Sequence, residues 1–169
     1  MLPKKAGMIL LKFRQAYIAD IPQLIDMRIA YLKEDYNGLT AEQTRTITSQ
    51  LQDYFKKHLN QDFFAFVCEE NEVIVSTVFL VIFEKPANPS FLTGLTGTIL
   101  NVYTLPQYRK RGIASTLIKM ALEHAKRKKL SYVDLKATQA GYSLYSKLGF
   151  IPDKPKNVPM IYHISQDMI

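Results

Sequence analysis

One short segment of the chain has the residue types and spacing to bind a phosphate group. Residues 109–114 read Arg-Lys-Arg-Gly-Ile-Ala, and apolar residues recur at helical spacing after Gly112. The first turn of a helix exposes unpaired backbone N–H groups and the positive end of the helix dipole, so an anion binds there without a special side chain. Gly112 allows close approach to the backbone, and the basic residues beside it favour a diphosphate over a single carboxylate.

The glycine spacing decides between families of phosphate-binding proteins. A Walker loop needs Gly-x-x-x-x-Gly-Lys-Ser/Thr and a dinucleotide fingerprint needs Gly-x-Gly-x-x-Gly, and neither occurs here. Residues 109–114 instead resemble the Arg/Gln-x-x-Gly-x-Gly/Ala signature of the GNAT (Gcn5-related) N-acetyltransferases. A second family signature follows in Ala137–Phe150, where Leu-Tyr-x-Lys-x-Gly-Phe ends the segment. On these two signatures, in this order, the chain is identified as a member of the family.

The resemblance implies an α/β (α+β) fold, a single domain in which helices flank a mixed central β-sheet with two splayed parallel strands. Hydrophobic patterns and capping residues predict elements in a compatible order. We expect strands over 12–17, 63–68, 73–83, 97–104, 132–136, at 151 and over 158–163, with 63–68 and 73–83 forming an antiparallel hairpin. Helices are expected to start near 20 and 40, each with a capping box (Asp20 with Gln23, Thr40 with Gln43), and near 112, and a short helix is expected within 137–150. Residues 1–11 are expected to form an N-terminal tail, and residues 12–169 the domain.

The resemblance also implies a donor and a site. Acetyl-CoA would lie between the splayed strands, with its pantetheine arm on the strand that ends near Thr104 and its pyrophosphate on the helix start that follows. Tyr145 matches the family tyrosine that protonates the departing CoA thiolate, a role that suits a phenol because its ordinary pKa is about 10. The implied cofactor-binding residues are Val102, Tyr103, Thr104, Arg109, Lys110, Arg111, Gly112, Ile113, Ala114, Ser115 and Thr138.

Three positions depart from the family pattern. Many members carry Asn where Thr138 stands and Ala where Gly141 stands, and the histone-acetylating branch has a glutamate general base where Thr98 stands. A lysine-like amine must lose a proton before it attacks, which costs about 4–5 kcal/mol at pH 7, whereas an α-amine near pKa ~8 costs only about 1 kcal/mol. The sequence therefore predicts either an acceptor amine of low pKa or a rate that rises with pH, and it leaves the general base unidentified.

Composition is that of one enzyme-sized domain. The 169 residues are 47% hydrophobic, enough to bury a core without disulfides or metal, and the single cysteine, Cys68, fits a reducing, cytoplasmic location. No apolar run reaches the ~20 residues of a membrane-spanning helix. The histidines are dispersed along the chain, so we expect no metal site.

The resemblance thus implies an acyltransferase of the kind that transfers groups other than amino-acyl groups. An acetyl group would pass from acetyl-CoA to a primary amine of a small molecule or peptide, by direct attack in a ternary complex. One alternative is a CoA-binding module that regulates without turnover. A weaker one is a nucleic-acid binder, because residues 109–129 hold eight basic residues and one acidic residue. We expect neither nucleic acid nor membrane as a partner, and we consider a homodimer through the apolar segment 160–164.

Overall fold

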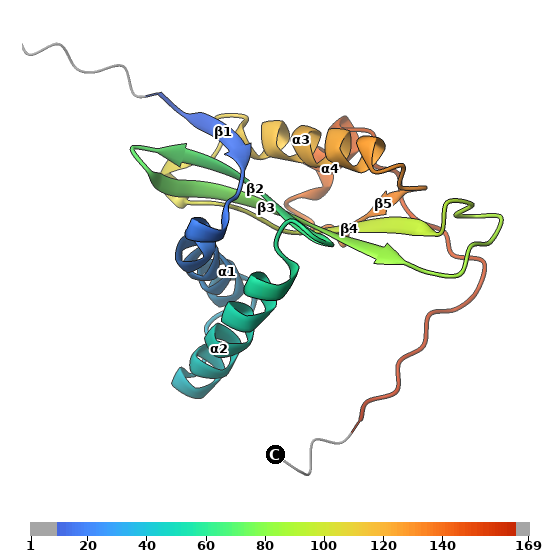
Figure 1. Ribbon diagram of the computed structural model, residues 1–169, viewed down its shortest axis with the longest axis horizontal. Coiled ribbons are helices and arrows are strands. Elements are labelled where there is room, and N and C mark those ends of the chain that lie inside the picture. The colour runs from blue at the N-terminus through green and yellow to red at the C-terminus, as the bar shows by residue number, and fades with distance from the viewer. Residues whose placement is uncertain (1–9, 165–169) are drawn as a thin grey trace, which may run out of the picture. The chain divides into compact units, whose positions relative to one another are not determined.

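The computed structural model describes residues 10–164, so most of the predicted N-terminal tail lies outside the described residues (Figure 1). The described chain divides into two compact units, with the boundary after Lys136. In chain order the elements are β1 (Lys12–Gln15), the 3-10 turn η1 (Ile18–Asp20), α1 (Ile21–Asp35), α2 (Ala41–His58), β2 (Phe63–Glu70), β3 (Val73–Glu84), β4 (Leu95–Thr104), the 3-10 turn η2 (Pro106–Tyr108), α3 (Ile113–Arg127), β5 (Val133–Asp134) and α4 (Tyr142–Lys147).

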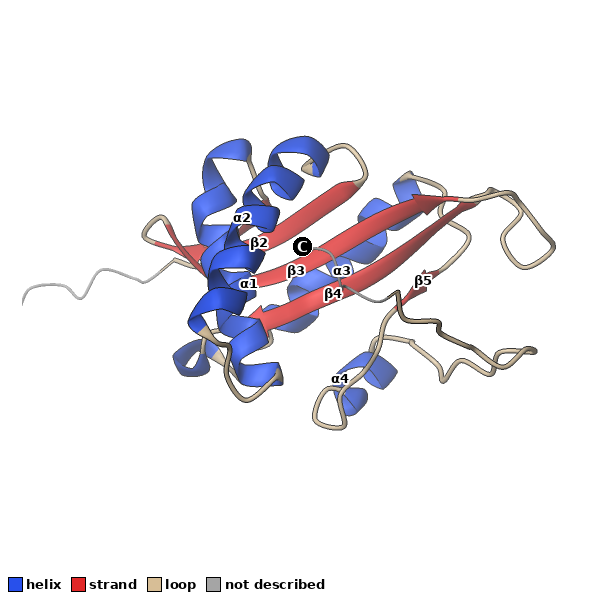
Figure 2. Cartoon of the chain, turned by 90° about the horizontal axis from the view of Figure 1, so that it is seen from below, coloured by secondary structure: helices blue, strands red, loops and turns tan. Residues whose placement is uncertain are grey.

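A five-stranded sheet forms the centre of the first unit, and its strands follow one another in chain order from β1 to β5. Figure 2 shows β2 to β5 in this order. The three pairs from β1 to β4 are antiparallel, whereas β5 runs parallel to β4 and pairs with it at Gly97 and Thr98 alone. The sheet is therefore mixed, as the sequence predicted. Its one parallel pair is very short.

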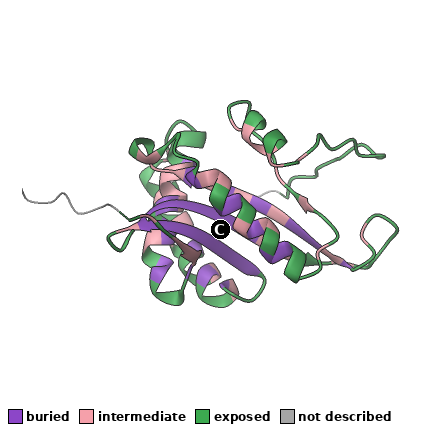
Figure 3. Ribbon diagram, turned by 90° about the horizontal axis from the view of Figure 1, so that it is seen from above, coloured by how far each residue is buried: buried purple, intermediate pink, exposed green. Residues whose placement is uncertain are grey.

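Helices cover both faces of this sheet. Figure 1 shows α1 and α2 on one face and α3 on the other, and Figure 3 shows that the central strands between them are buried. On the side of α1 and α2, the rings of Phe55, Phe63 and Phe79 pack with centroids 5.0–5.7 Å apart. On the other side, Leu117 and Ile118 of α3 are fully buried. The amphipathic patterns of the sequence thus give a three-layer unit.

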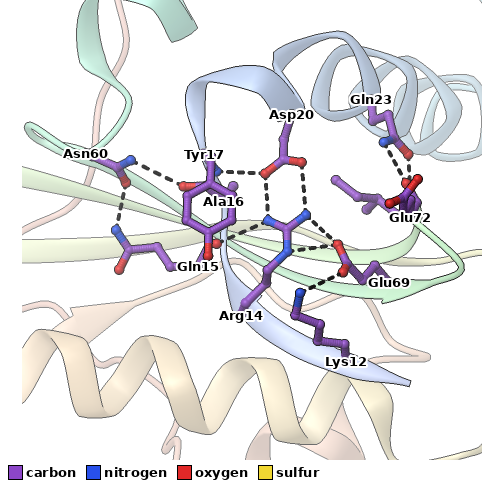
Figure 4. Close-up of polar contacts among 11 residues, drawn as sticks. Lys12, Arg14, Gln15, Ala16, Tyr17, Asp20, Gln23, Asn60, Glu69 and Glu72 are labelled. Carbon is purple, nitrogen blue, oxygen red and sulfur yellow. Dashed lines mark hydrogen bonds and ion pairs between the residues drawn. The ribbon is translucent and has the colours of Figure 1, made fainter. Parts of the chain in front are cut away.

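The two predicted capping boxes have different outcomes. The box at Thr40 is confirmed, since the Gln43 N–H donates to Thr40 Oγ1 and the Thr40 N–H donates to Gln43 Oε1. The box at Asp20 is wrong. The Asp20 carboxylate accepts instead from Arg14 and from the Tyr17 N–H (Figure 4). The partly buried cation of Arg14 competes for this carboxylate, so charge pairing replaces the local cap.

The predicted strands at residue 151 and over 158–163 are wrong for the structure described here. Residues 151–164 have neither helix nor strand and are exposed, with apolar side chains such as Met160 and Ile161 at 93% and 79% exposure. β-Branched and aromatic residues favour strands only where a neighbouring strand takes up their backbone hydrogen bonds. Within the described residues, no helix is both long and apolar enough to span a membrane.

Candidate functional site

One edge of β4 is open. Its pairing with β5 ends at Thr98, and no other described strand pairs with the following residues, 99–104, on that side. An irregularity in β4 accounts for the separation of β4 from β5. The register of β4 against β3 shifts between the β3 residues Thr77 and Phe79. Opposite that shift, Asn101 has the left-handed φ of +52°. A bulge of this kind bends a strand and changes the direction of the groups that follow it.

The bulge is held by a buried polar contact. Asn101 is only 2% exposed, and its Nδ2 donates to Thr77 Oγ1 at 2.9 Å. Asparagine tolerates a left-handed conformation better than other side chains of its size. The position of the bulge is therefore fixed by the type of residue at 101 and by its partner on β3.

Hydrogen bonds show which backbone groups face the open edge. The Leu105 N–H donates to the Val75 carbonyl, and Ser76 Oγ donates to the Tyr103 carbonyl. The backbone groups of Tyr103 and Leu105 therefore face β3. Because successive residues of a strand alternate, the groups of Val102 and Thr104 face away from β3. Of the three β4 residues predicted to contact the pantetheine arm, these two are turned toward the open edge.

The start of α3 has the geometry of an anion cradle. Gly112 is the N-cap residue, has a φ of +75° and supplies no side-chain cap. The first helical hydrogen bond runs from the Thr116 N–H to the Gly112 carbonyl, so the N–H groups of Ile113, Ala114 and Ser115 have no acceptor within the helix. A Cβ placed on Gly112 would meet nothing within 4 Å. The glycine therefore serves the backbone conformation and leaves open space above the helix start.

The basic side chains next to this cradle make contacts within the protein. Arg109 donates from Nε to the Thr104 carbonyl at 2.8 Å and from Nη2 to Glu34 at 2.7 Å, and the bond to Glu34 raises the pKa of Arg109. Its guanidinium thus ties α1 to the end of β4. Arg111 donates to the Gln107 carbonyl, while Lys110 has a φ of +60° and is exposed.

Comparison with known proteins gives the family. A model of the acetyltransferase (GNAT) family matches residues 26–150. The chain belongs to the GNAT acetyltransferase family. No curated protein matches it.

Solved structures agree with this GNAT assignment. A GCN5-related N-acetyltransferase from Ralstonia eutropha JMP134 is 26% identical, with a TM-score of 0.75 over 89% of this chain and 99% of that one. A predicted acetyltransferase from Clostridium acetobutylicum, solved with acetyl-CoA, is 27% identical, with a TM-score of 0.79 over 90% of this chain and 96% of that one. An aminoglycoside N-acetyltransferase in complex with CoA shares the fold, at 13% identity and a TM-score of 0.65 over 98% and 99% of the two chains.

The second GNAT signature lies in the second unit. Tyr145 is on α4, and its ring packs edge-on against Phe150 with centroids 6.0 Å apart. A Cβ at Gly141 would lie 2.8 Å from Tyr145 Cε2, so the glycine found in place of the common alanine leaves room for this ring. Thr138 Oγ1 accepts from the Gly141 N–H at 3.1 Å, which occupies it in the turn before α4.

Sequence reasoning missed one carboxylate near the position of the GNAT glutamate. Thr98, the residue that the sequence places at that position, donates from Oγ1 to Asp134 Oδ1 at 2.6 Å. Asp134 is on β5 and is paired with Thr98 in the parallel register. Aligning the predicted strands 97–104 and 132–136 as parallel neighbours would have brought the two residues together.

Two further reactive side chains, Cys68 and His124, are buried in the core. Cys68 is fully buried, and burial raises the pKa of its thiol to about 11, so it stays protonated at neutral pH. His124 packs on the ring of Phe64 with centroids 4.1 Å apart, and burial lowers its pKa, an effect that Arg127 reinforces. Among residues 10–164 there is no cluster of three or more His, Cys, Asp or Glu side chains that could hold a metal ion.

Proposed function

We propose that the protein is an acetyl-CoA-dependent N-acetyltransferase that acts on a primary amine of a small molecule or peptide. The observation that carries the proposal is the combination of an open β4 edge with an uncapped α3 start within one unit. The pantetheine arm is an amide chain and can pair, as an added strand would, with Val102 and with the N–H of Thr104, whose carbonyl accepts from Arg109. The pyrophosphate then takes the N–H groups of residues 113–115.

The proposed chemistry is direct transfer in a ternary complex. The acceptor nitrogen attacks the thioester carbonyl, the C–N bond forms, the C–S bond breaks, and the thiolate takes the phenolic proton of Tyr145. The support for Tyr145 is its place in the second GNAT signature. Tyr145→Phe should lower kcat at least about 100-fold, the ordinary scale for loss of a general acid, and leave acetyl-CoA affinity unchanged.

We further propose Asp134 as the group that accepts the amine proton, directly or through water. Its support is the hydrogen bond from Thr98, which orients a carboxylate beside the usual position of the GNAT base. Asp134→Asn should lower kcat/KM most at low pH and least near the pKa of the acceptor amine, where free amine is already abundant. An equal loss at every pH would contradict this role.

The first experiment is calorimetric titration with acetyl-CoA and CoA. Gly112→Gln fills the open space above the helix start and should abolish micromolar binding. Gly38→Gln is the matched control, because Gly38 also has a positive φ and open space around it but lies between α1 and α2. Loss of binding in the Gly112 variant alone supports the cradle, whereas no binding by the folded wild type would contradict the proposed function.

Turnover separates the proposed enzyme from its alternatives. A regulatory CoA-binding module would bind acetyl-CoA with no amine acetylated, and Tyr145→Phe would have no effect. A nucleic-acid binder would bind in a steeply salt-dependent way that neutralising residues 126–129 abolishes.

We also propose a homodimer through residues 160–164, whose apolar side chains are exposed in the single chain. Sedimentation of the wild type against a Met160→Asp variant tests this contact.

A further inference from the structure

A partly buried arginine on α1 contacts β4 at its bulge. Arg28 is on α1, and its Nη1 donates to Asn101 Oδ1 at 3.3 Å. Its Cζ lies 5.5 Å from the centre of the Tyr31 ring. The guanidinium thus has an aromatic face on one side and a neutral amide oxygen on another.

Among the described residues, this guanidinium has no carboxylate partner. In residues 10–164, no Asp or Glu oxygen lies within 4.0 Å of Arg28, and the other described arginines either have such a partner or are exposed. Burial lowers the pKa of Arg28, and the nearby Tyr31, Tyr36 and Asp35 offset this only in part. A cation that has lost water without gaining an anion is unusual in a folded protein, because such charges are normally paired.

The position of Arg28 relates it to the proposed transfer site. Its partner Asn101 directly precedes Val102, whose backbone groups face the open edge. Asn101 is itself held by Thr77, so the contact from α1 reaches a fixed point on β4. An anion bound by Arg28 would therefore lie beside the proposed course of the pantetheine arm.

We propose that Arg28 binds an anionic group of the acceptor, so that the substrates are amines that also carry a carboxylate or a phosphate. This inference rests on the proposed acetyltransferase function. A guanidinium has five N–H donors, of which the contact with Asn101 uses one. Planar carboxylates and phosphates are the groups that a guanidinium binds most strongly, often through two parallel hydrogen bonds.

The first test compares acceptors in matched pairs. Glycine with glycinamide tests the carboxylate, and phosphoethanolamine with ethanolamine tests the phosphate. The pH of each assay is set to give equal free-amine fractions within a pair.

In at least one pair, wild type should acetylate the anionic member with a kcat/KM at least tenfold higher than that of the neutral member. Arg28→Gln should lose this preference through KM, Arg28→Lys should regain part of it, and the exposed Arg127→Gln should keep it. A wild type that prefers the neutral member of both pairs, or neither member, overturns the proposal.

The second test needs no turnover. Arginine Nε–Hε signals in a ¹⁵N spectrum are followed as sodium acetate or inorganic phosphate is added to the CoA-bound protein, and the Arg28 signal is identified by its loss in Arg28→Gln. A saturable shift of the Arg28 signal with either anion supports the site and shows which anion it takes. No shift with either overturns it. A saturable shift without acetylation of any amine would reject the proposed function and support the anion site. Acetylation without a shift would support the proposed function and reject the anion site.

Discussion

Two partly buried arginines on the same unit have opposite surroundings. Arg14 on β1 lies between two carboxylates, with Asp20 at 2.7 Å and Glu69 bonded to its Nε at 2.8 Å (Figure 4). Both hydrogen bonds raise the pKa of Arg14 against the effect of burial. Arg28 on α1 has a neutral amide and an aromatic ring, and burial lowers its pKa.

The difference separates a structural charge from a binding charge. The group around Arg14 joins β1, η1 and β2, and Lys12 adds a second cation at 3.2 Å from Glu69. Its charges are nearly balanced within the protein, so nothing else is needed to complete it. Arg28 has no anionic partner among residues 10–164, which is the property expected of a group that binds a ligand.

The largest expected effect is on stability at Arg14. Arg14→Met leaves two poorly solvated carboxylates without their cation, and we expect a loss of about 3 kcal/mol in the free energy of unfolding. Urea denaturation followed by circular dichroism measures it, with the exposed Arg127→Met as control. A loss below about 1 kcal/mol would remove the contrast between the two arginines.

Acid should weaken the same group. The bond from Arg14 lowers the pKa of Glu69, and Arg14 with the Tyr17 N–H lowers that of Asp20 although burial alone would raise it. A lowered folded-state pKa gives stability that is complete above the ordinary carboxyl value and is lost as pH falls through the folded value. We expect a loss on the order of 2 kcal/mol between pH 5 and pH 2. Urea denaturation across this range should show a shallower slope in Arg14→Met.

Asn101→Gly tests whether the amide beside Arg28 positions its guanidinium. Glycine keeps the left-handed backbone but removes the amide that contacts Thr77 and Arg28. We expect a loss of about 1 kcal/mol in unfolding free energy, the ordinary value of one buried hydrogen bond, and a weaker response of Arg28 to added anions. Denaturation and the arginine ¹⁵N spectrum measure the two effects. An unchanged spectral response would mean that Asn101 does not position Arg28.

Arg28→Met should have the smallest effect on stability. Methionine keeps most of the apolar stem, and removing a desolvated cation offsets the lost contact with Asn101, so we expect a change within about 0.5 kcal/mol. Denaturation beside Arg14→Met measures it under identical conditions. A loss as large as that at Arg14 would make Arg28 a structural residue.

The sequence predicted local features better than contacts between distant segments. The β2–β3 hairpin, the Thr40 capping box and the helix after Gly112 each follow from neighbouring residues, and all three form. The contact between Arg28 and Asn101 joins residues 73 apart in the chain, and the bulge at Asn101 depends on its partner in β3. Neither the contact nor the bulge can be recognised from the hydrophobic or capping pattern of neighbouring residues. The prediction of C-terminal strands was wrong for a related reason. Strand propensity is local, whereas a strand also needs a neighbouring strand to pair with.

The open edge of β4 also has a consequence for the exchange of amide hydrogens with solvent. Leu105 donates its amide hydrogen to β3, whereas the amides of Val102 and Thr104 face the side that has no strand partner among the described residues. Unprotected and protected amides therefore alternate from the end of β4 to the residue that follows it. In deuterated water Val102 and Thr104 should exchange far faster than Leu105. A bound amide chain would slow these two and leave Leu105 unchanged, so their exchange rates report directly on occupancy of the edge.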